Sequence, residues 1–560
     1  MFPYVEESFT AAEEAILRRY VTNLDLPVFA LVNLPEVVKG ALFARYSRSS
    51  KSLRRLFLDE FVGDLDVTGD ITVDATVGLK RAEELYERVF FEYGDDSVAQ
   101  LGGVHLACEQ SSNVLSKVLE RGRLMAYLEQ STRYIGYDSR LPSGHYRYYR
   151  PPEILESALG ARYVGDLDRM FDTYADLLPR VQTWLSARYP RDPADSDLVH
   201  RRAVRAKALD AIRGLLPAAS LSNIGMYGTG QSYELLLLRM RTHPLPEARH
   251  YADMMLAELR KVIPSFLQRI DQPDRGGEWS GYLAATRDDT ARVVERLWPG
   301  AADGAGPATG GTAGGPELPE VPEVPEVTLL DFDPEGEDKV LAAICFPHTA
   351  MSDAEALRRV GSLSTEDRAA LLAAYVGERR NRRHRPGRAF ERTEYRFEVT
   401  TDYGAFRDLQ RHRLLTVEWQ PLGVSLGHDL PAVVVEAGLE QPFVESIERS
   451  RELHSLLAPQ FPAQAPYAVA LGFRIRFILQ MNAREAMHLI ELRSGPQGHP
   501  AYRRVAQQMH RAIEEVAGHG GIARSMVHVD HGATDLERLD AERRAERRRG
   551  SREVGESAPS

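Results

Sequence analysis

Residues 121–134 gather side chains that bind anions. The stretch contains Arg121, Arg123 and Arg133 together with Ser131. Guanidinium groups bind phosphate through paired hydrogen bonds and keep their charge at any working pH. Each charged hydrogen bond contributes roughly 1.5–3 kcal/mol, so several are needed for micromolar binding of a nucleotide. The stretch therefore predicts a phosphate site. Surface ion pairs with neighbouring glutamates are the alternative interpretation.

A second basic stretch is Arg411-His412-Arg413. If the two arginines crowd the imidazole, their like charges favour its neutral form, which both donates and accepts a hydrogen bond. Such a group suits the binding of a neutral or anionic ring system. A solvated basic triplet is the alternative.

A third set of polar residues follows Asn482 on a predicted helix. Arg484, His488 and Glu491 recur at helical spacing and share one face of that helix. This face predicts a binding surface, and an intrahelical ladder of salt bridges explains it equally well.

Several kinds of site find no support in the sequence. No set of His, Asp and Glu has convincing metal-ligand spacing, and Glu234 and His243 lack partners at useful separations. No glycine-rich loop follows a strand in the dinucleotide-binding pattern. No Ser-His-Asp arrangement can be assigned.

The composition is that of a globular protein. The chain has 560 residues, 43% of them hydrophobic and 27% charged, which predicts two or three domains. A net charge of −11 argues against a general nucleic-acid binder. With two cysteines, no secretory leader pattern and no membrane-length apolar run, we expect a cytoplasmic protein without a membrane span.

The composition changes sharply over residues 299–327, which are rich in Ala, Gly and Pro and predict a flexible linker. We therefore expect an N-terminal domain over residues 1–298 and a C-terminal domain over 328–533. A charged tail over 534–560 should form a frayed helix and then disorder. Its Arg543–Arg549 cluster could touch nucleic acid, but a solvated tail is the more economical interpretation.

Secondary structure was predicted from the period of the apolar residues. The pattern predicts helices over 153–190, 196–215, 232–241, 247–262 and 355–383, strands over 340–346 and 393–400, and a helix or strand over 97–120.

The two halves of the chain share an internal repeat. When Arg239 is placed on Arg493, each is preceded by Leu and followed by Pro, Arg and Met at the same offsets. Each half also carries an Arg-x-Arg pair upstream. The separation between this pair and the Leu-Arg pair is longer in the first half, which predicts additional helix there. The ordered set of matches indicates a duplication.

Together these residues resemble the flavin-dependent thymidylate synthases. The signature of that family is Arg-His-Arg, seven residues, Ser, and Arg two positions later. Residues 121–133 satisfy it except that Gly122 stands in place of His. In the second half the Arg-His-Arg triplet is intact, but Pro421 and Gly423 stand where Ser and Arg belong. The second half keeps an Asn-x-Arg helix entry at Asn482, and the first half has Gly228-Thr229-Gly230 there.

The resemblance implies a division of labour between the halves, because their departures are complementary. The first half keeps the residues that bind dUMP in the family: Arg121, Arg123, Glu129, Gln130, Ser131, Thr132, Arg133 and Arg213. The second half keeps the residues that hold FAD: Arg411, His412, Arg413, Asn482, Arg484, His488 and Arg493. Arg239 would be the catalytic residue, stabilising negative charge that develops on the uracil ring.

The resemblance also implies a fold and a reaction. The fold class is α+β, with two related domains, each a mostly antiparallel sheet flanked by helices. The activity is reductive methylation of dUMP to dTMP, with methylenetetrahydrofolate and NADPH as co-substrates. A homodimer would mimic the family's tetramer. The alternatives are a divergent homologue that binds flavin or nucleotide and is either non-catalytic or acts on another substrate, and an unrelated helical interaction protein with solvated arginines.

Overall fold

The computed structural model describes residues 7–25, 29, 31–36, 38–39, 41–42, 51–62, 100–300, 325–533 and 535–556, without the side chains of 549–556. These residues form two compact units, which are treated separately below. Unit 1 comprises Met1–Glu109, Gly122–Glu129 and Asn223–Pro299, and unit 2 comprises Gln110–Arg121, Gln130–Ser222 and Gly300–Ser560. The first repeat thus contributes to both units. The predicted domain limits stay a prediction, and most of the predicted linker lies outside the described residues.

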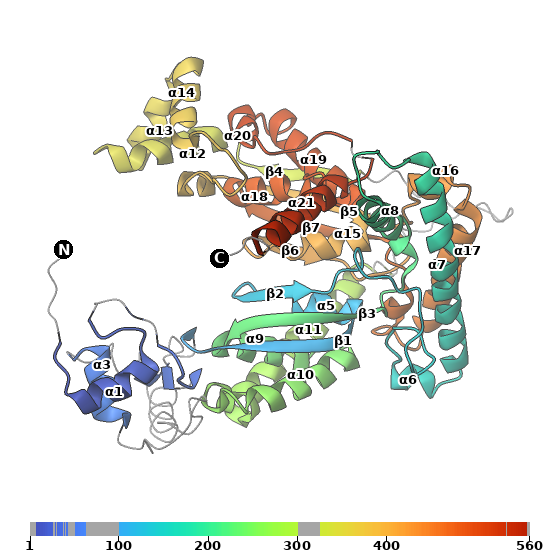
Figure 1. Ribbon diagram of the computed structural model, residues 1–560, viewed down its shortest axis with the longest axis horizontal. Helices are drawn as coiled ribbons and strands as arrows, with labels where there is room; N and C mark the ends of the chain where they lie inside the picture. Colours follow the sequence, from blue (N-terminus) through green and yellow to red (C-terminus); the bar gives the residue numbers. More distant parts are fainter. Residues whose placement is uncertain are drawn as a thin grey trace. The chain divides into compact units, whose positions relative to one another are not determined.

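Unit 1 holds a three-stranded sheet in the order β1-β3-β2 (Figure 1). Its strands are β1 (Gly103–Ser112), β2 (Met125–Glu129) and β3 (Leu221–Thr229). Strands β2 and β3 pair antiparallel, from Met125 opposite Gly228 to Glu129 opposite Ile224. The chain then enters α9 (Gly230–Arg241) and α10 (Pro246–Leu259), which pack against each other.

Unit 2 holds a four-stranded antiparallel sheet in the order β4-β5-β7-β6 (Figure 1). Its strands are β4 (Val327–Phe332), β5 (Glu394–Asp402), β6 (Thr416–Trp419) and β7 (Arg474–Asn482). Apolar and polar residues alternate along β7, so that Ile475, Phe477, Leu479 and Met481 all point into the core. Helix α19 (Pro500–Glu515) packs against β4 and β5.

The same elements recur in the two repeats. Helix α5 (Asn113–Leu119) corresponds residue for residue to α15 (Tyr403–Leu409), since α5 lies between β1 and β2 in sequence order and α15 between β5 and β6. Further along, α9 corresponds to α18 (Ala483–Arg493) and α10 to α19. The strand order β1-β3-β2 matches β5-β7-β6. The predicted duplication and the α+β fold class are therefore confirmed.

The predicted extra helix of the first repeat is also present. Between the edge strand and the inner strand, the first repeat has α7 (Gly160–Arg188) and α8 (Asp197–Ile212), where the second has α17 (Glu440–Leu457) as its long helix. Helix α7 packs against both α8 and α17 within unit 2.

Other elements complete the described chain. They are α1 (Ala11–Tyr20), α3 (Leu53–Glu60), α6 (Pro152–Leu155), η4 (Arg213–Leu215), η5 (Pro264–Asp271), the π-helical η6 (Pro273–Gly277), α11 (Glu278–Leu297), α12 (Gly336–Cys345), η8 (Phe346–His348), α13 (Asp353–Gly361), α14 (Thr365–Val376), η9 (Arg388–Arg392), α16 (Ala432–Glu436), η10 (Ala465–Ala468), α20 (Gly520–Ser525) and α21 (Leu539–Glu556). No helix within these described ranges has the length and apolar character needed to cross a membrane.

Two predicted elements need correction. The apolar run at residues 340–346 is not a strand, because α12 spans most of it and buries Val340, Leu341 and Ile344 on the core side. A short apolar run has no period that separates a buried helix from a strand. The predicted helix over 355–383 is instead α13 and α14, because Ser364 caps a new helix.

The tail also differs from the predicted frayed helix. Helix α21 packs against α8. Arg543 donates two hydrogen bonds, of 2.6 and 2.8 Å, to the carboxylate of Asp195. Arg543, which belongs to the cluster that was expected to be solvated, therefore fastens α21 to the segment before α8.

Within unit 2 the two repeats pair through equivalent backbone segments, one after η4 and one before β7. Ala218 N donates to Val469 O (2.7 Å), and Gly472 N donates to Gly214 O (2.9 Å). Gly472 has no room for a side chain, because an added Cβ would lie 3.2 Å from Gly214 O.

We therefore expect Gly472→Val to destabilise unit 2. The extra carbons press on backbone atoms that cannot move aside, and such overpacking costs about 1–3 kcal/mol. Gly423→Val is the matched control, since nothing lies within 4 Å of an added Cβ there. Calorimetric unfolding should give a lower Tm for Gly472→Val than for the control, and equal Tm values would contradict the close approach.

Candidate functional site

Unit 2 gathers four arginines from both repeats, two of them buried and two half-buried, beside three aspartates. We call this set the arginine cluster: Arg133, Arg213, Arg411 and Arg493 with Asp210, Asp402 and Asp408. Arg213 lies in η4 and Arg493 is the last residue of α18. Five of the predicted site residues, these four arginines and His412, are therefore brought together.

Asp408 is the acid that links the two repeats. It lies in the last turn of α15 and forms an ion pair with Arg411. Its carboxylate also lies 3.6 Å from Arg493 and 3.7 Å from Arg213 of the first repeat. Burial opposes ionisation, but Arg411, Arg493 and Arg213 hold the pKa of Asp408 far below its usual value. Asp408 is therefore a fixed negative charge.

Arg133 is held by a second buried acid. Its Nε and Nη2 donate to the two carboxylate oxygens of Asp210 at 2.7 and 2.6 Å, and its Nη1 donates to Tyr502 Oη at 2.6 Å. Ser131 Oγ accepts from the backbone N–H of Arg133 at 3.2 Å. The bidentate pair fixes the plane of the guanidinium.

Arg213 keeps an unused donor. Its Nη2 lies 3.5 Å from Asp402 Oδ1, and its buried Nε has no hydrogen-bond partner among the described residues. A cavity of about 510 Å³ in unit 2 is lined by Arg213, Asp402, Arg504 and His499, among others. Burial raises the pKa of Asp402 to about 6 against the opposing effect of Arg213. This cavity has room for a polar ligand that accepts from Arg213.

His412 is held as a neutral imidazole. Arg493 Nε donates to His412 Nε2 at 3.1 Å, so His412 Nδ1 carries the proton and donates to Glu485 Oε1 at 3.1 Å. Burial, followed by Arg493 and His488, lowers the pKa of His412 well below its usual value. The sequence predicted the neutral form from the flanking arginines, and burial is the larger cause.

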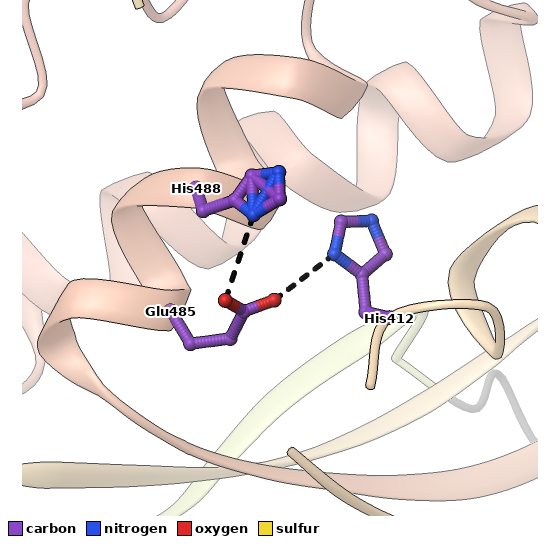
Figure 2. Close-up of side chains that lie close together, drawn as sticks. All are labelled: His412, Glu485 and His488. Carbon is purple, nitrogen blue, oxygen red and sulfur yellow. Dashed lines mark hydrogen bonds and ion pairs between the residues drawn. The ribbon is translucent and has the colours of Figure 1, made fainter. Parts of the chain in front are cut away.

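Glu485 also faces His488 (Figure 2). Its Oε2 lies 3.5 Å from His488 Nδ1, which is buried and has no hydrogen-bond partner in the part of the chain that is described. Burial, followed by the charge of Arg385, lowers the pKa of His488 to about 4. His412, Glu485 and His488 have the spacing of a metal site. The sequence patterns did not indicate this set, because none of them includes Glu485.

The remaining second-repeat residues have mostly structural partners. Asn482 Oδ1 caps α18 by accepting from Glu485 N at 2.9 Å. Arg484 Nε donates to Pro386 O at 3.0 Å, and Glu491 accepts two hydrogen bonds of 2.6 Å from Arg379. The intrahelical ladder of Arg484, His488 and Glu491 is therefore absent. Arg413 is exposed.

The predicted surface pairing of the first basic stretch is also different. Glu120 pairs with the buried Lys117. Arg121 lies 4.0 Å from Glu418 and 5.2 Å above the ring of Trp419, both on β6 of the second repeat. Of the neighbouring residues, Thr132 is buried and Gln130 is half-buried.

Three predicted residues belong to unit 1, namely Arg123, Glu129 and Arg239. Arg123 is exposed, Glu129 is buried on β2, and Arg239 is half-buried in the last turn of α9. Unit 1 also explains Gly122. Its N–H donates to Tyr127 Oη at 2.9 Å, and an added Cβ would lie 2.6 Å from that oxygen. A histidine in this loop would require the tyrosine side chain to move aside.

The residues of unit 2 fit the two expected ligands electrostatically. The unused Nε of Arg213 is a free donor for a phosphate or a uracil oxygen. The arginines that depress the pKa values of His412 and His488 create a positive potential, which suits the diphosphate of a flavin dinucleotide.

Comparisons with known proteins agree with the duplication. The sequence model of a family described as thymidylate synthase complementing protein matches residues 41–265 and 328–518. A UPF0159 protein of Chlamydia muridarum is 38% identical over 543 residues, covering 96% of this chain and 99% of the relative. A UPF0159 protein of Thermoplasma acidophilum is 33% identical over 533 residues, covering 90% and 97%. Both relatives therefore span the two repeats.

Glu485 should make stability depend on pH. Burial raises the pKa of Glu485 to about 7 from an ordinary 4.5, although Arg385 and Arg484 oppose the shift. The folded state therefore binds this proton more tightly than the unfolded state. The resulting stabilisation is complete below pH 4.5 and is lost as the pH rises through 7. It amounts to a change on the order of 1–3 kcal/mol.

Glu485→Gln removes this titration. The free energy of unfolding of the wild type, relative to Glu485→Gln, should fall between pH 5 and pH 8 in urea titrations. Glu366→Gln, an exposed change on α14, serves as the control and should show no such trend. A difference that stays constant with pH would contradict the assignment.

Proposed function

Because the chain belongs to the thymidylate synthase complementing protein family, we propose that it is a flavin-dependent thymidylate synthase that converts dUMP to dTMP. The observation that carries the proposal is the arginine cluster. Arg213, from the repeat with the dUMP-binding residues, shares Asp408 with Arg411 and Arg493, from the repeat with the flavin-binding residues. Arg133 and Arg493 both lie over the ring of Tyr502, and Arg493 donates to His412.

The proposed reaction balances with two co-substrates. Methylenetetrahydrofolate supplies a CH2 unit, which forms a carbon–carbon bond to C5 of the uracil as the C5–H proton leaves. A hydride from NADPH completes the methyl group as the two carbon–nitrogen bonds to the folate break, and the folate nitrogens take up two protons, one in place of the proton lost from C5. The products are dTMP, tetrahydrofolate and NADP⁺. FAD, when bound, carries the hydride from NADPH to the one-carbon unit.

The residues of the first repeat bind the nucleotide in this proposal. The unused Nε of Arg213 faces the ligand, and the bidentate Asp210 keeps Arg133 oriented. Preorganised donors cost little reorganisation when charge develops on the substrate. Arg239 contacts the uracil ring and stabilises its developing negative charge, while Ser131 contacts the nucleotide and is not a nucleophile.

The residues of the second repeat hold the flavin. Neutral His412, fixed by Arg493 and Glu485, presents a ring of defined tautomer. Arg413 and Arg484 supply positive charge for the diphosphate. A homodimer then brings four repeats together, which extends the division of labour to a second chain.

A second candidate is a homologue that binds flavin or nucleotide but does not methylate. Two observations favour it. Gly122 replaces the family's histidine, and Tyr127 fills the space. Asp210 and Asp408 also satisfy arginines that would otherwise meet a phosphate.

The synthase proposal predicts a flavin-coloured protein that releases the C5 proton of dUMP. We expect tritium release from [5-³H]dUMP to require both methylenetetrahydrofolate and NADPH, with dTMP as the product by chromatography. Bound flavin without release would support the non-methylating homologue. Colourless protein that binds neither added FAD nor dUMP would contradict both proposals.

The divided labour can be tested with two exposed arginines at equivalent places in the repeats, Arg123 and Arg413. Arg413→Ala should lower the FAD content while leaving dUMP affinity near that of the wild type. Arg123→Ala should weaken dUMP binding about tenfold or more and leave the flavin bound, because a charged hydrogen bond is worth roughly 1.5–3 kcal/mol. Flavin absorbance and calorimetric titration measure the two effects, and equal loss of both ligands in each variant would count against separate roles.

A further inference from the structure

Arg538 is a buried arginine that forms no ion pair with any acid in the described part of the chain. Its side chain is 5% exposed, and it precedes α21, beyond residue 518 where the family match ends. Its guanidinium makes no hydrogen bond or ion pair with any described residue, and its Nε is buried. Its guanidinium instead lies 3.8 Å above the ring of Tyr134.

The surroundings of Arg538 carry an excess of positive charge. Burial lowers the pKa of Arg538, and the guanidinium of Arg133 lowers it further. Asp210 is the acid that acts on Arg538, but both of its carboxylate oxygens already accept from Arg133. Buried charges are normally paired, so this second guanidinium calls for an anion.

Neighbouring residues of the C-terminal segment fix the position of Arg538. The preceding residue, Glu537, is buried and forms an ion pair of 2.8 Å with the largely covered Lys207. After it, Arg543 binds Asp195 through two hydrogen bonds. Both partners flank or lie on α8, the helix that also carries Asp210. The segment 535–548 is thus fastened at both ends of α8, with Arg538 held between its anchors.

We propose that Arg538 is a phosphate-binding residue that the C-terminal segment adds to the arginine cluster. The guanidinium groups of Arg538 and Arg133 take the phosphate of a nucleoside monophosphate, and the exposed ring of Tyr134 supports Arg538. Two adjacent guanidiniums match a dianion in charge. Arg538 offers paired donors in a plane, while most donors of Arg133 already bond Asp210, Tyr502 and Gln497, so that Arg133 contributes mainly its charge. The identity of the nucleotide as dUMP rests on the proposed function, whereas the phosphate chemistry does not.

Removal of an unpartnered buried charge gives two opposite effects. In ligand-free protein, Arg538→Met should raise the Tm by a few degrees, because an apolar side chain of similar length replaces an uncompensated charge. In calorimetric titrations the same variant should bind dUMP 10- to 100-fold more weakly and bind deoxyuridine, which lacks the phosphate, as the wild type does. Arg544→Gln, an exposed change on α21, should leave both affinities unchanged.

Arg538→Lys keeps the charge but loses the paired donors, so it should weaken dUMP binding by a smaller factor. Inorganic phosphate, compared with chloride at equal ionic strength, should raise the Tm of the wild type more than that of Arg538→Met. Equal weakening of dUMP and deoxyuridine, or wild-type affinity for dUMP in Arg538→Met, would overturn the proposal. Wild-type protein that binds neither dUMP nor phosphate would also overturn it.

The outcomes separate this inference from the proposed function. Phosphate or dUMP binding that depends on Arg538 in a protein without dTMP formation sustains the phosphate site and refutes the synthase. Formation of dTMP at wild-type rate and KM for dUMP in Arg538→Met sustains the synthase and refutes the phosphate site.

Discussion

The burial of arginine charge inside unit 2 is the constraint on which the rest of this structure depends. Asp408 ties arginines of two repeats together, and Asp210 fixes a further one. Loss of one partner from such a set leaves a charge without compensation, which is far costlier than loss of a surface pair. The two repeats are therefore bound to each other by charge as well as by the backbone pairing at Gly214 and Gly472.

Because the sequence is duplicated, each repeat can lose site residues that the other repeat keeps. In the first repeat, Tyr127 closes the loop at Gly122, and Gly230 lies where an added Cβ would meet Phe266 at 2.7 Å. In the first repeat these glycine positions are closely packed and carry no side chain. The second repeat keeps polar side chains at the equivalent positions, His412 and Arg484. Thr229 still caps α9 as Asn482 caps α18, so the helix entry survives without the arginine. The fold of a repeat thus tolerates the loss of site residues more readily than the loss of capping residues.

The sequence was informative where a feature repeats or is local. The Leu-Arg and Arg-x-Arg pairs predicted the duplication, and the alternation of residues 393–400 predicted β5. The acids of the arginine cluster escaped prediction because a lone Asp on a helix has no local pattern. Asp210 and Asp408 acquire meaning only from arginines far away in the chain. Arg538 could not be predicted for a different reason. The tail is rich in Arg and Glu, so its pattern does not distinguish one buried arginine from the solvated ones.

His412, Glu485 and His488 have metal-ligand spacing, and the charges around them determine whether they suit a metal ion or an anion. A divalent cation needs deprotonated ligand nitrogens. Because Arg493 donates to His412 Nε2, the nitrogen that faces Glu485 carries the proton. The same arginines that depress the pKa values of both histidines would repel the metal, and one carboxylate cannot offset them. An anion placed beside these groups is attracted by each of these arginines. The set therefore suits an anionic cofactor better than a metal ion.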